Sequence, residues 1–242
     1  MSWIKIHKPG FFSTIQDNGI YGYKKYGIPQ SGSLDYVAST ISNYLSFSER
    51  DNPVFEFTLD GPTIEFGFDT YIGITGASMN PKINNSPTEM YKTIIVKKGD
   101  ILSFSQAEKG ARTYLSVYGD LELKKFLDSY STNTVAKYGG YKGRQFLSGD
   151  ILHFDQKKNL KNLKYRSIKK STIDYLYRNI NILRFIKGPE YKFFPKDSIE
   201  NFNNSKYEVS KKFNRMGIRF EGNKIYSEIS NITSSAVIPG II

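Results

Sequence analysis

The sequence contains no cysteine among its 242 residues and only two histidines, His7 and His153. Without cysteine the chain can form no disulfide framework, no thiolate zinc site and no cysteine nucleophile. Because the two histidines lie far apart in the sequence, we also expect no metal site. A Gly-x-x-x-x-Gly-Lys-Ser/Thr phosphate loop is missing too. Ser31, His7 and Asp35 have the residue types of a hydrolytic triad, but nothing in the sequence brings them together, so the residues alone name no reaction.

Long apolar stretches are equally absent. No run of about 18 apolar residues occurs, and the opening segment has no apolar stretch of signal-peptide length. We therefore expect a cytoplasmic protein that neither spans a membrane nor is secreted.

The positive charge is unevenly distributed. The formal net charge is +11, and residues 157–184 hold nine basic residues against the single acid Asp174. Such a run is more typical of a solvated linker than of a basic binding face. Tyr165, Tyr175 and Tyr177 lie within it without the stacking arrangement that is usual in nucleic-acid binding. We therefore expect no nucleic-acid partner.

Most of the chain has the pattern of short strands separated by Gly, Pro and Asn. Residues 54–59 alternate, with Phe55 and Phe57 on one face and Glu56 and Thr58 on the other. The content of 18 Tyr and 17 Phe also favours strands. Further strand-like segments are 71–75, 93–96, 101–105, 113–117, 182–187, 207–210 and 217–221. The sequence therefore predicts a mainly β chain, built as barrels, with a few short helices.

Short sequence patterns also predict a repeated turn and three helices. Gly-Asp-Ile-Leu at residues 99–102 recurs at 149–152, which predicts two tight turns that each lead into a half-buried strand. Apolar residues at helical spacing predict a helix over 34–45, with Ser33 as its cap and Asp35 in its first turn. Shorter helices are expected over 121–128 and from Pro195 to residue 203.

The change to a basic, polar composition near residue 156 divides the chain. We expect an N-terminal β-barrel domain over 1–155, a basic linker over 156–181 and a C-terminal β-domain over 182–242.

Several motifs follow one another along nearly the whole chain. They occupy residues 9–19, 22–23, 27–29, 31–35, 52–53, 56–62, 75–77, 110–115, 139–144, 149–150, 188–190, 215–219 and 237–240. In this order they resemble the biotin-dependent carboxyltransferase, or allophanate hydrolase subunit 2, family. That family includes the C subunit of 5-oxoprolinase, the kinase anti-inhibitor KipA and part of the carboxyltransferase region of urea carboxylase.

The resemblance implies two cyclophilin-like β-barrel domains and a heteromeric complex. The implied partner is a sister subunit, similar to the B subunit of 5-oxoprolinase or to KipI, and the implied substrate is a small amide. ATP would be used by the complex as a whole, and biotin is not expected to be attached to this chain.

The chain also departs from the family pattern. Ile20 stands where an Arg normally follows the Gln-Asp-x-Gly motif, and residues 128–132 lack the Arg of a Gly-Ser-Arg-x-Thr element. Asp60 and Glu190 replace a Gly and a Gln. Family members continue into a Gln-Thr-x-Gly-Gly-Tyr-Pro segment, whereas this sequence stops at Ile242, so we expect the C-terminal domain to be incomplete relative to the family.

The motif matches supply the candidate site residues. Arg112, Arg144 and Arg215 are candidate catalytic cations, because Arg binds carboxylate or phosphate through a bidentate fork, and Asp35 is a candidate base. The candidate substrate-binding residues are Gln16, Asp17, Ser31, Glu56, Thr75 and Gly76. The structural alternatives are ion pairs for the arginines, a helix start for Asp35, loop hydrogen bonds for residues 16, 17 and 31, and tight packing for 75–77.

Two classes of function fit these features. The first is a subunit of an ATP-dependent 5-oxoprolinase-type complex with a shared active site, or a carboxyltransferase subunit that acts on urea or allophanate. The second is a non-catalytic, KipA-like protein that sequesters a kinase inhibitor. The lost arginines and the missing C-terminal segment favour the second.

Overall fold

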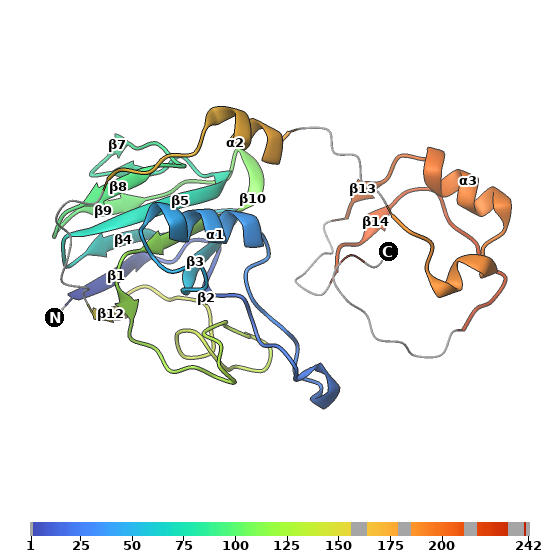
Figure 1. Cartoon of the computed structure of the whole chain (residues 1–242), viewed down its shortest axis with the longest axis horizontal. Helices are drawn as coiled ribbons and strands as arrows, with labels where there is room; N and C mark the ends of the chain where they lie inside the picture. The colour runs from blue at the N-terminus through green and yellow to red at the C-terminus, as the bar shows by residue number, and fades with distance from the viewer. Residues whose placement is uncertain (1, 156–163, 179–184, 211–216, 232–239, 241–242) are drawn as a thin grey trace. The chain divides into compact units, whose positions relative to one another are not determined.

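The computed structural model describes residues 2–155, 164–178, 185–210, 217–231 and 240 (Figure 1). The chain divides into two compact units, Met1–Tyr177 and Arg178–Ile242. The domain boundaries expected at residues 155 and 181 remain a prediction. The described part of the expected linker contains a helix, α2 (Lys170–Leu176), that belongs to the first unit.

Two antiparallel sheets form the first unit. The larger sheet has the order β11-β12-β1-β4-β9-β6-β7 and the smaller has the order β2-β3-β10-β5-β8. The larger sheet consists of β11 (Asp120–Leu121), β12 (Ile151–Asp155), β1 (Ser2–Lys8), β4 (Thr63–Phe66), β9 (Ile101–Ser103), β6 (Lys82–Ile83) and β7 (Ser86–Pro87). The smaller consists of β2 (Phe12–Gln16), β3 (Val54–Thr58), β10 (Lys109–Val117), β5 (Thr70–Ser78) and β8 (Thr93–Val96). The expectation of a mainly β chain with few helices is therefore confirmed.

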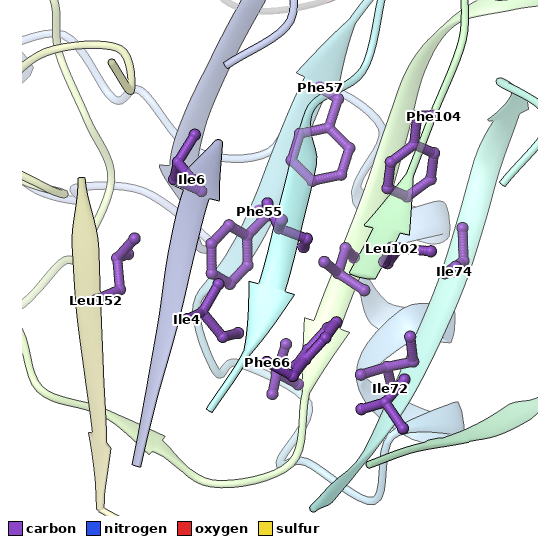
Figure 2. Packing of buried hydrophobic residues seen from close by; sticks show 14 of the residues in the cluster. Ile4, Ile6, Phe55, Phe57, Phe66, Ile72, Ile74, Leu102, Phe104 and Leu152 are labelled. Atoms are coloured by element: carbon purple, nitrogen blue, oxygen red, sulfur yellow. The ribbon is translucent and has the colours of Figure 1, made fainter. Parts of the chain in front are cut away.

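One hydrophobic core lies between the two sheets. Phe57 of β3 is fully buried, and its ring centroid lies 5.1 Å from that of Phe104. Figure 2 shows the aliphatic and aromatic side chains that meet there, which include Ile4, Ile6, Phe66, Leu102 and Leu152 from the larger sheet and Phe55, Phe57, Ile72 and Ile74 from the smaller. The prediction that Phe55 and Phe57 share one face of their strand is therefore confirmed, and that face is the one that lies in the core.

Helix α1 (Tyr36–Leu45) covers the outer face of the smaller sheet and packs against β5, β10 and β3. The packing is close, because a Cβ added to Gly73 would lie 2.3 Å from the carbonyl oxygen of Ser42. Ala38 of α1, Val54 and Tyr114 form a small second core on this face. As a result both faces of the smaller sheet are buried, and polar side chains on its outer face need partners within the protein.

The two Gly-Asp turns have the predicted form and the same internal hydrogen bonds. Gly99 and Gly149 have φ of +90° and +88°. Asp100 accepts a hydrogen bond from the N–H of Lys97 at 2.7 Å, and Asp150 accepts one from the N–H of Leu147 at 2.8 Å. Each turn leads into a strand of the larger sheet, so the repeated sequence encodes a repeated turn.

The second unit has a small amount of regular structure in its described residues. It contains the 3₁₀ helix η2 (Pro189–Phe193), the helix α3 (Lys196–Asn204) and an antiparallel pair formed by β13 (Glu208–Val209) and β14 (Phe220–Glu221). The helix expected after Pro195 is thus confirmed. A further 3₁₀ helix, η1 (Lys24–Tyr26), belongs to the first unit.

Two local predictions were wrong. Residues 121–128 form no helix, because Leu121 pairs with Phe154 in the larger sheet and Leu127 and Asp128 adopt positive φ in a turn. Ser33 does not cap α1. The cap is Asp35, whose carboxylate accepts a hydrogen bond from the N–H of Ala38 at 2.9 Å.

We expect the core between the sheets to dominate stability. Phe57→Ala would lower the free energy of unfolding by about 3–5 kcal/mol, because it leaves a cavity in the closely packed core. Phe11→Ala is the matched control, since Phe11 is 66% exposed and its loss should cost less than about 0.5 kcal/mol. Chemical denaturation followed by circular dichroism measures both, and equal losses would contradict this description of the core.

Candidate functional site

A buried carboxylate lies at the centre of the outer face of the smaller sheet. Glu56 of β3 is 1% exposed. Its Oε2 accepts hydrogen bonds from the backbone N–H of Leu34 at 3.0 Å and from the hydroxyl of Tyr114 at 2.9 Å. The register of the sheet explains the second bond, because Tyr114 of β10 lies directly opposite Glu56. Glu56 therefore lies on the strand face opposite Phe55 and Phe57, as predicted, and this face is enclosed and polar.

Arg112 lies two residues before Tyr114 on the same face of β10. Its Nε is 3.6 Å from Oε1 of Glu56, and its side chain is 13% exposed. This Nε is buried and has no hydrogen-bond partner among the described residues. The two groups therefore attract each other as opposite charges, while the Nε–H of Arg112 has no acceptor within hydrogen-bond distance among the described residues.

The start of α1 is attached to this carboxylate. The backbone N–H of Asp35 donates to the hydroxyl of Tyr114 at 2.7 Å, and Tyr114 in turn donates to Glu56. Burial, followed by the negative charge of Glu56, raises the pKa of Tyr114 above its ordinary value. Tyr114 therefore remains a neutral donor at any physiological pH.

Thr75 and Gly76 of β5 lie beside the same helix. Thr75 Oγ1 donates to the carbonyl of Ala38 at 2.6 Å. The hydroxyl of Tyr91 donates to the carbonyl of Gly76 at 2.7 Å and accepts from its N–H at 2.9 Å. Gly76 has φ of +90°, and a Cβ there would lie 2.3 Å from the carbonyl oxygen of Arg112, so only glycine fits.

An open groove of about 940 Å³ begins at Gly76 and Tyr91. Lys82, Glu89 and Glu108 contribute charges to its walls. Burial raises the pKa of Tyr91, which therefore presents a neutral hydroxyl beside the groove. The peptide of Gly76 is thus held at a position that a small molecule in the groove can reach.

Gln16, Asp17 and Ser31 belong to a second polar cluster that fastens residues 129–133. The Oδ1 of Asp17 accepts from the N–H of Gly19 at 2.8 Å and from the hydroxyls of Ser129 and Ser131, and its Oδ2 accepts from the N–H of Tyr130 at 2.6 Å. These bonds are loop-holding contacts, the structural alternative that the sequence offered for Asp17.

The side chains of Gln16 and Ser31 form fewer hydrogen bonds than that of Asp17. Gln16 Nε2 donates to Thr14 at 3.0 Å and to the carbonyl of Thr132 at 3.3 Å, whereas its buried Oε1 has no partner among the described residues. Ser31 Oγ accepts a long bond of 3.5 Å from Asn133. A substrate-binding role for the three residues of this cluster remains a prediction.

Arg144 forms a bidentate ion pair with Asp150. The two N···O distances are 2.7 and 2.8 Å, and the guanidinium also donates to the carbonyl of Gln145 at 2.8 Å. Burial by itself would raise the pKa of Asp150, but the hydrogen bonds from Arg144 and the N–H of Leu147 outweigh it and hold the pKa below its ordinary value. The guanidinium is occupied by the protein itself, so a catalytic role for Arg144 remains a prediction.

The remaining candidate, Arg215, lies outside the described residues. The two positions where the family resemblance implies an arginine are packed as apolar or aromatic residues. Ile20 is 2% exposed, and Tyr130 packs against the main core with the ammonium of Lys125 above its ring at 5.2 Å. Neither position places a positive charge near Glu56.

The structure thus brings five of the candidates to the start of α1. They are Asp35, Glu56, Thr75, Gly76 and Arg112. Sequence reasoning missed the tyrosines that connect them, Tyr91, Tyr114 and Tyr177. The pairing of β3 with β10 was the signal that could have identified Tyr114, since it places the alternating residues 112 and 114 opposite 58 and 56.

The described residues form neither a metal cluster nor a membrane span. No three His, Cys, Asp or Glu side chains gather closely enough there to hold a metal ion. Nor does any helix in that part of the chain combine the length and apolar character needed to span a bilayer.

Residues 26–242 match the family model of the carboxyltransferase domain, subdomains A and B. The chain is 33% identical over 227 residues to urea amidolyase of Saccharomyces cerevisiae, covering 91% of this chain and 12% of that protein. It is 29% identical over 240 residues to the C subunit of 5-oxoprolinase from Escherichia coli, covering 99% of this chain and 75% of that relative. The chain thus spans most of the bacterial relative and only a small part of the yeast enzyme.

The fold is similar to that of a solved yeast relative. The crystal structure of Kluyveromyces lactis urea carboxylase superposes with a TM-score of 0.81 at 28% identity, covering 95% of this chain and 21% of that one. The similarity therefore extends over both units of the chain.

The Arg144–Asp150 pair predicts a pH-dependent stability. Asp150→Asn should lower the free energy of unfolding by about 1–3 kcal/mol at pH 7, because it removes a charged hydrogen-bond acceptor. The pKa of Asp150 is lower in the folded state than its ordinary value of 3.8, so the stabilisation is fully present above that value and is lost as the pH falls through the folded-state pKa.

Urea denaturation between pH 7 and pH 3 measures this effect. The difference between the wild type and Asp150→Asn should be constant down to about pH 5 and shrink below it. Asp155→Asn, which changes an exposed carboxylate at the far end of β12, is the control. A difference that does not change with pH would rule out the ion pair as its source.

Proposed function

The chain belongs to the family of the carboxyltransferase domain, subdomains A and B, and on this basis we propose that it is one component of a 5-oxoprolinase-type complex that activates a small amide. The active site is shared with a sister subunit that is similar to the B subunit of 5-oxoprolinase. The extent of the match to the C subunit of the Escherichia coli enzyme, 99% of this chain and 75% of that relative, supports this choice.

The observation that carries the proposal is the Arg112–Glu56 pair at the start of α1. Nucleophilic attack on the carbonyl carbon of an amide places negative charge on the carbonyl oxygen. A positioned donor in a site with little water stabilises this charge most effectively. Arg112 has a buried N–H with no partner in the described residues, and Glu56 lies 3.6 Å away, where it holds the guanidinium in place.

The other groups of the cluster have supporting roles in this proposal. Tyr114 and the N–H of Leu34 satisfy one oxygen of Glu56, so that the carboxylate stays at a fixed distance from Arg112. Asp35 is occupied as the cap of α1 and orients that helix. The backbone of Gly76, whose N–H and carbonyl are bonded to the hydroxyl of Tyr91, lines the groove.

ATP is assigned to the complex and not to this chain. The sequence holds no Gly-x-x-x-x-Gly-Lys-Ser/Thr loop, and the cation with a free buried donor among the described residues is Arg112. Arg112 suits one anionic group and does not amount to a triphosphate site. The sister subunits would therefore supply most of the nucleotide contacts.

A second candidate is a carboxyltransferase that acts on urea or allophanate. The 33% identity to yeast urea amidolyase and the TM-score of 0.81 to Kluyveromyces lactis urea carboxylase favour it. In this case Arg112 would bind the carboxyl group that is transferred. Biotin would be carried by another chain or domain and would supply that carboxyl group when bound.

The deciding experiment is reconstitution with the sister subunits from the same genome. We expect 5-oxoproline-dependent ATP hydrolysis by the assembled complex. Arg112→Lys should lower kcat at least about 10²-fold, because the lysine ammonium cannot reproduce the position of the Nε donor. Arg50→Lys, which replaces a guanidinium that lies over the ring of Tyr36 at 5.4 Å from its centroid, should leave the rate unchanged.

Two outcomes would overturn the proposal. An intact complex that hydrolyses ATP only with urea would establish the carboxyltransferase. An intact complex without ATP hydrolysis would establish a KipA-like regulatory protein, which the apolar packing of Ile20 and Tyr130 would then explain.

A further inference from the structure

Residues 164–177, which we call the strap, extend the smaller sheet beyond its edge strand β8. The carbonyl of Arg166 accepts from the N–H of Thr93 at 2.7 Å, and the N–H of Arg166 donates to Thr93 Oγ1 at 3.0 Å. The N–H of Ile168 donates to the carbonyl of Tyr91 at 2.9 Å. The strap therefore forms backbone hydrogen bonds with Tyr91, which precedes β8, and with Thr93, the first residue of β8.

One side chain anchors the strap to the end of α1. Arg166 Nη1 donates to the carbonyl of Tyr44 at 2.7 Å. Its guanidinium lies over the rings of Tyr44 and Phe47, at 4.5 and 4.4 Å from their centroids. A cation at the C-terminus of a helix is also favoured by the helix dipole. Arg166 is thus the main attachment of the strap to the helix.

The other end of the strap reaches the start of α1. The hydroxyl of Tyr177 donates to Asp35 Oδ2 at 3.4 Å, and its ring centroid lies 5.9 Å from that of Tyr91. The two tyrosine hydroxyls are also close enough for each to shift the pKa of the other. Through these contacts Tyr177 joins the helix cap to the tyrosine that holds Gly76.

The two phenolic hydroxyls of this cluster have separate acceptors. Tyr91 donates to the carbonyl of Gly76, and Tyr177 donates to Asp35 Oδ2. A change in the position of Tyr177 therefore alters both the hydrogen bond to Asp35 and the ring contact with Tyr91. Both hydroxyls remain protonated at neutral pH, because burial raises their pKa values.

The helix of the strap buries little surface. Helix α2 spans only seven residues, buries none of them and has no side-chain hydrogen bond at its N-cap. An element with so little buried surface opens at a small fraction of the free energy of global unfolding. The strap can therefore leave the sheet while the core between the two sheets stays intact.

We infer that Tyr177 and Tyr91 are positioning residues, through which docking of the strap sets the Gly76 peptide and the Asp35 cap at the candidate site. That the placed atoms serve an amide-activating reaction rests on the proposed function, whereas the coupling itself does not. Because Tyr177 is the last residue of the first unit, the strap is also the covalent connection to the second.

Amide hydrogen exchange of the full chain tests the coupling. Arg166→Gln should undock the strap and raise the exchange rates of the Gly76 and Ala38 amides together, by about tenfold, which corresponds to the loss of roughly one hydrogen bond. Tyr177→Phe should raise exchange at the same two amides. Tyr91→Phe should raise it at Gly76 alone.

Tyr165→Phe is the control, because Tyr165 belongs to the strap but is 69% exposed. It should leave both amides at their wild-type rates, and Arg166→Lys should restore part of the protection that Arg166→Gln removes. Unchanged exchange at Gly76 and Ala38 in both Arg166→Gln and Tyr177→Phe would overturn the inference. Circular dichroism of each variant confirms that the sheets remain folded.

The reconstituted complex gives the second readout. If the positioned atoms serve the reaction, Tyr177→Phe should lower kcat with a smaller change in KM, and Tyr165→Phe should change neither. A wild-type complex without turnover would contradict the proposed function. It would leave the coupling between the strap and the Gly76 and Ala38 amides standing, because the exchange rates test that coupling independently. Turnover that is identical in wild type and Tyr177→Phe would overturn the role of the coupling in the reaction.

Discussion

A carboxylate buried inside a protein costs several kcal/mol unless it is paired and hydrogen-bonded. Glu56 meets this requirement with partners from two parts of the chain. Tyr114 and Arg112 come from the neighbouring strand, and the N–H of Leu34 comes from the segment that leads into α1. The need to satisfy one buried charge therefore fixes where α1 begins and which residues of β10 face it.

The same constraint explains why polar atoms gather at this end of the smaller sheet. Helix α1 closes the outer face, so each polar group below it must bond to the helix or to a neighbour. Thr75 bonds to the carbonyl of Ala38, and Gly76 approaches the backbone of Arg112 so closely that no side chain fits. Among the described residues, what remains is one cation whose buried Nε–H has no acceptor, close to a peptide that lines a groove. Such an arrangement fits the recognition of an anionic or strongly polar group better than that of an apolar ligand.

Much of this could be predicted from the sequence, although the contacts could not. Alternation identified β3 and the opposite directions of Phe57 and Glu56, because period-two burial is a local property. The helix predicted over 121–128 failed, since the pairing of Leu121 in the sheet overrides local propensity. The sequence alone does not show that Tyr91, Tyr114 and Tyr177 connect the site residues. Their roles depend on which strands pair and on where residues 164–177 dock. Motif matching found Glu56 and Arg112 but could not show that Arg144 is bound to Asp150.

A double-mutant cycle with Glu56→Gln and Tyr114→Phe tests most directly whether the buried carboxylate organises this face. The free energies of unfolding of the wild type, both single variants and the double variant give the coupling between the two side chains. We expect a coupling energy of about 1–3 kcal/mol, since the hydroxyl of Tyr114 donates to a charged, buried acceptor. Additive losses with no coupling would contradict the account, because they would mean that Glu56 does not hold β10 and the start of α1 together.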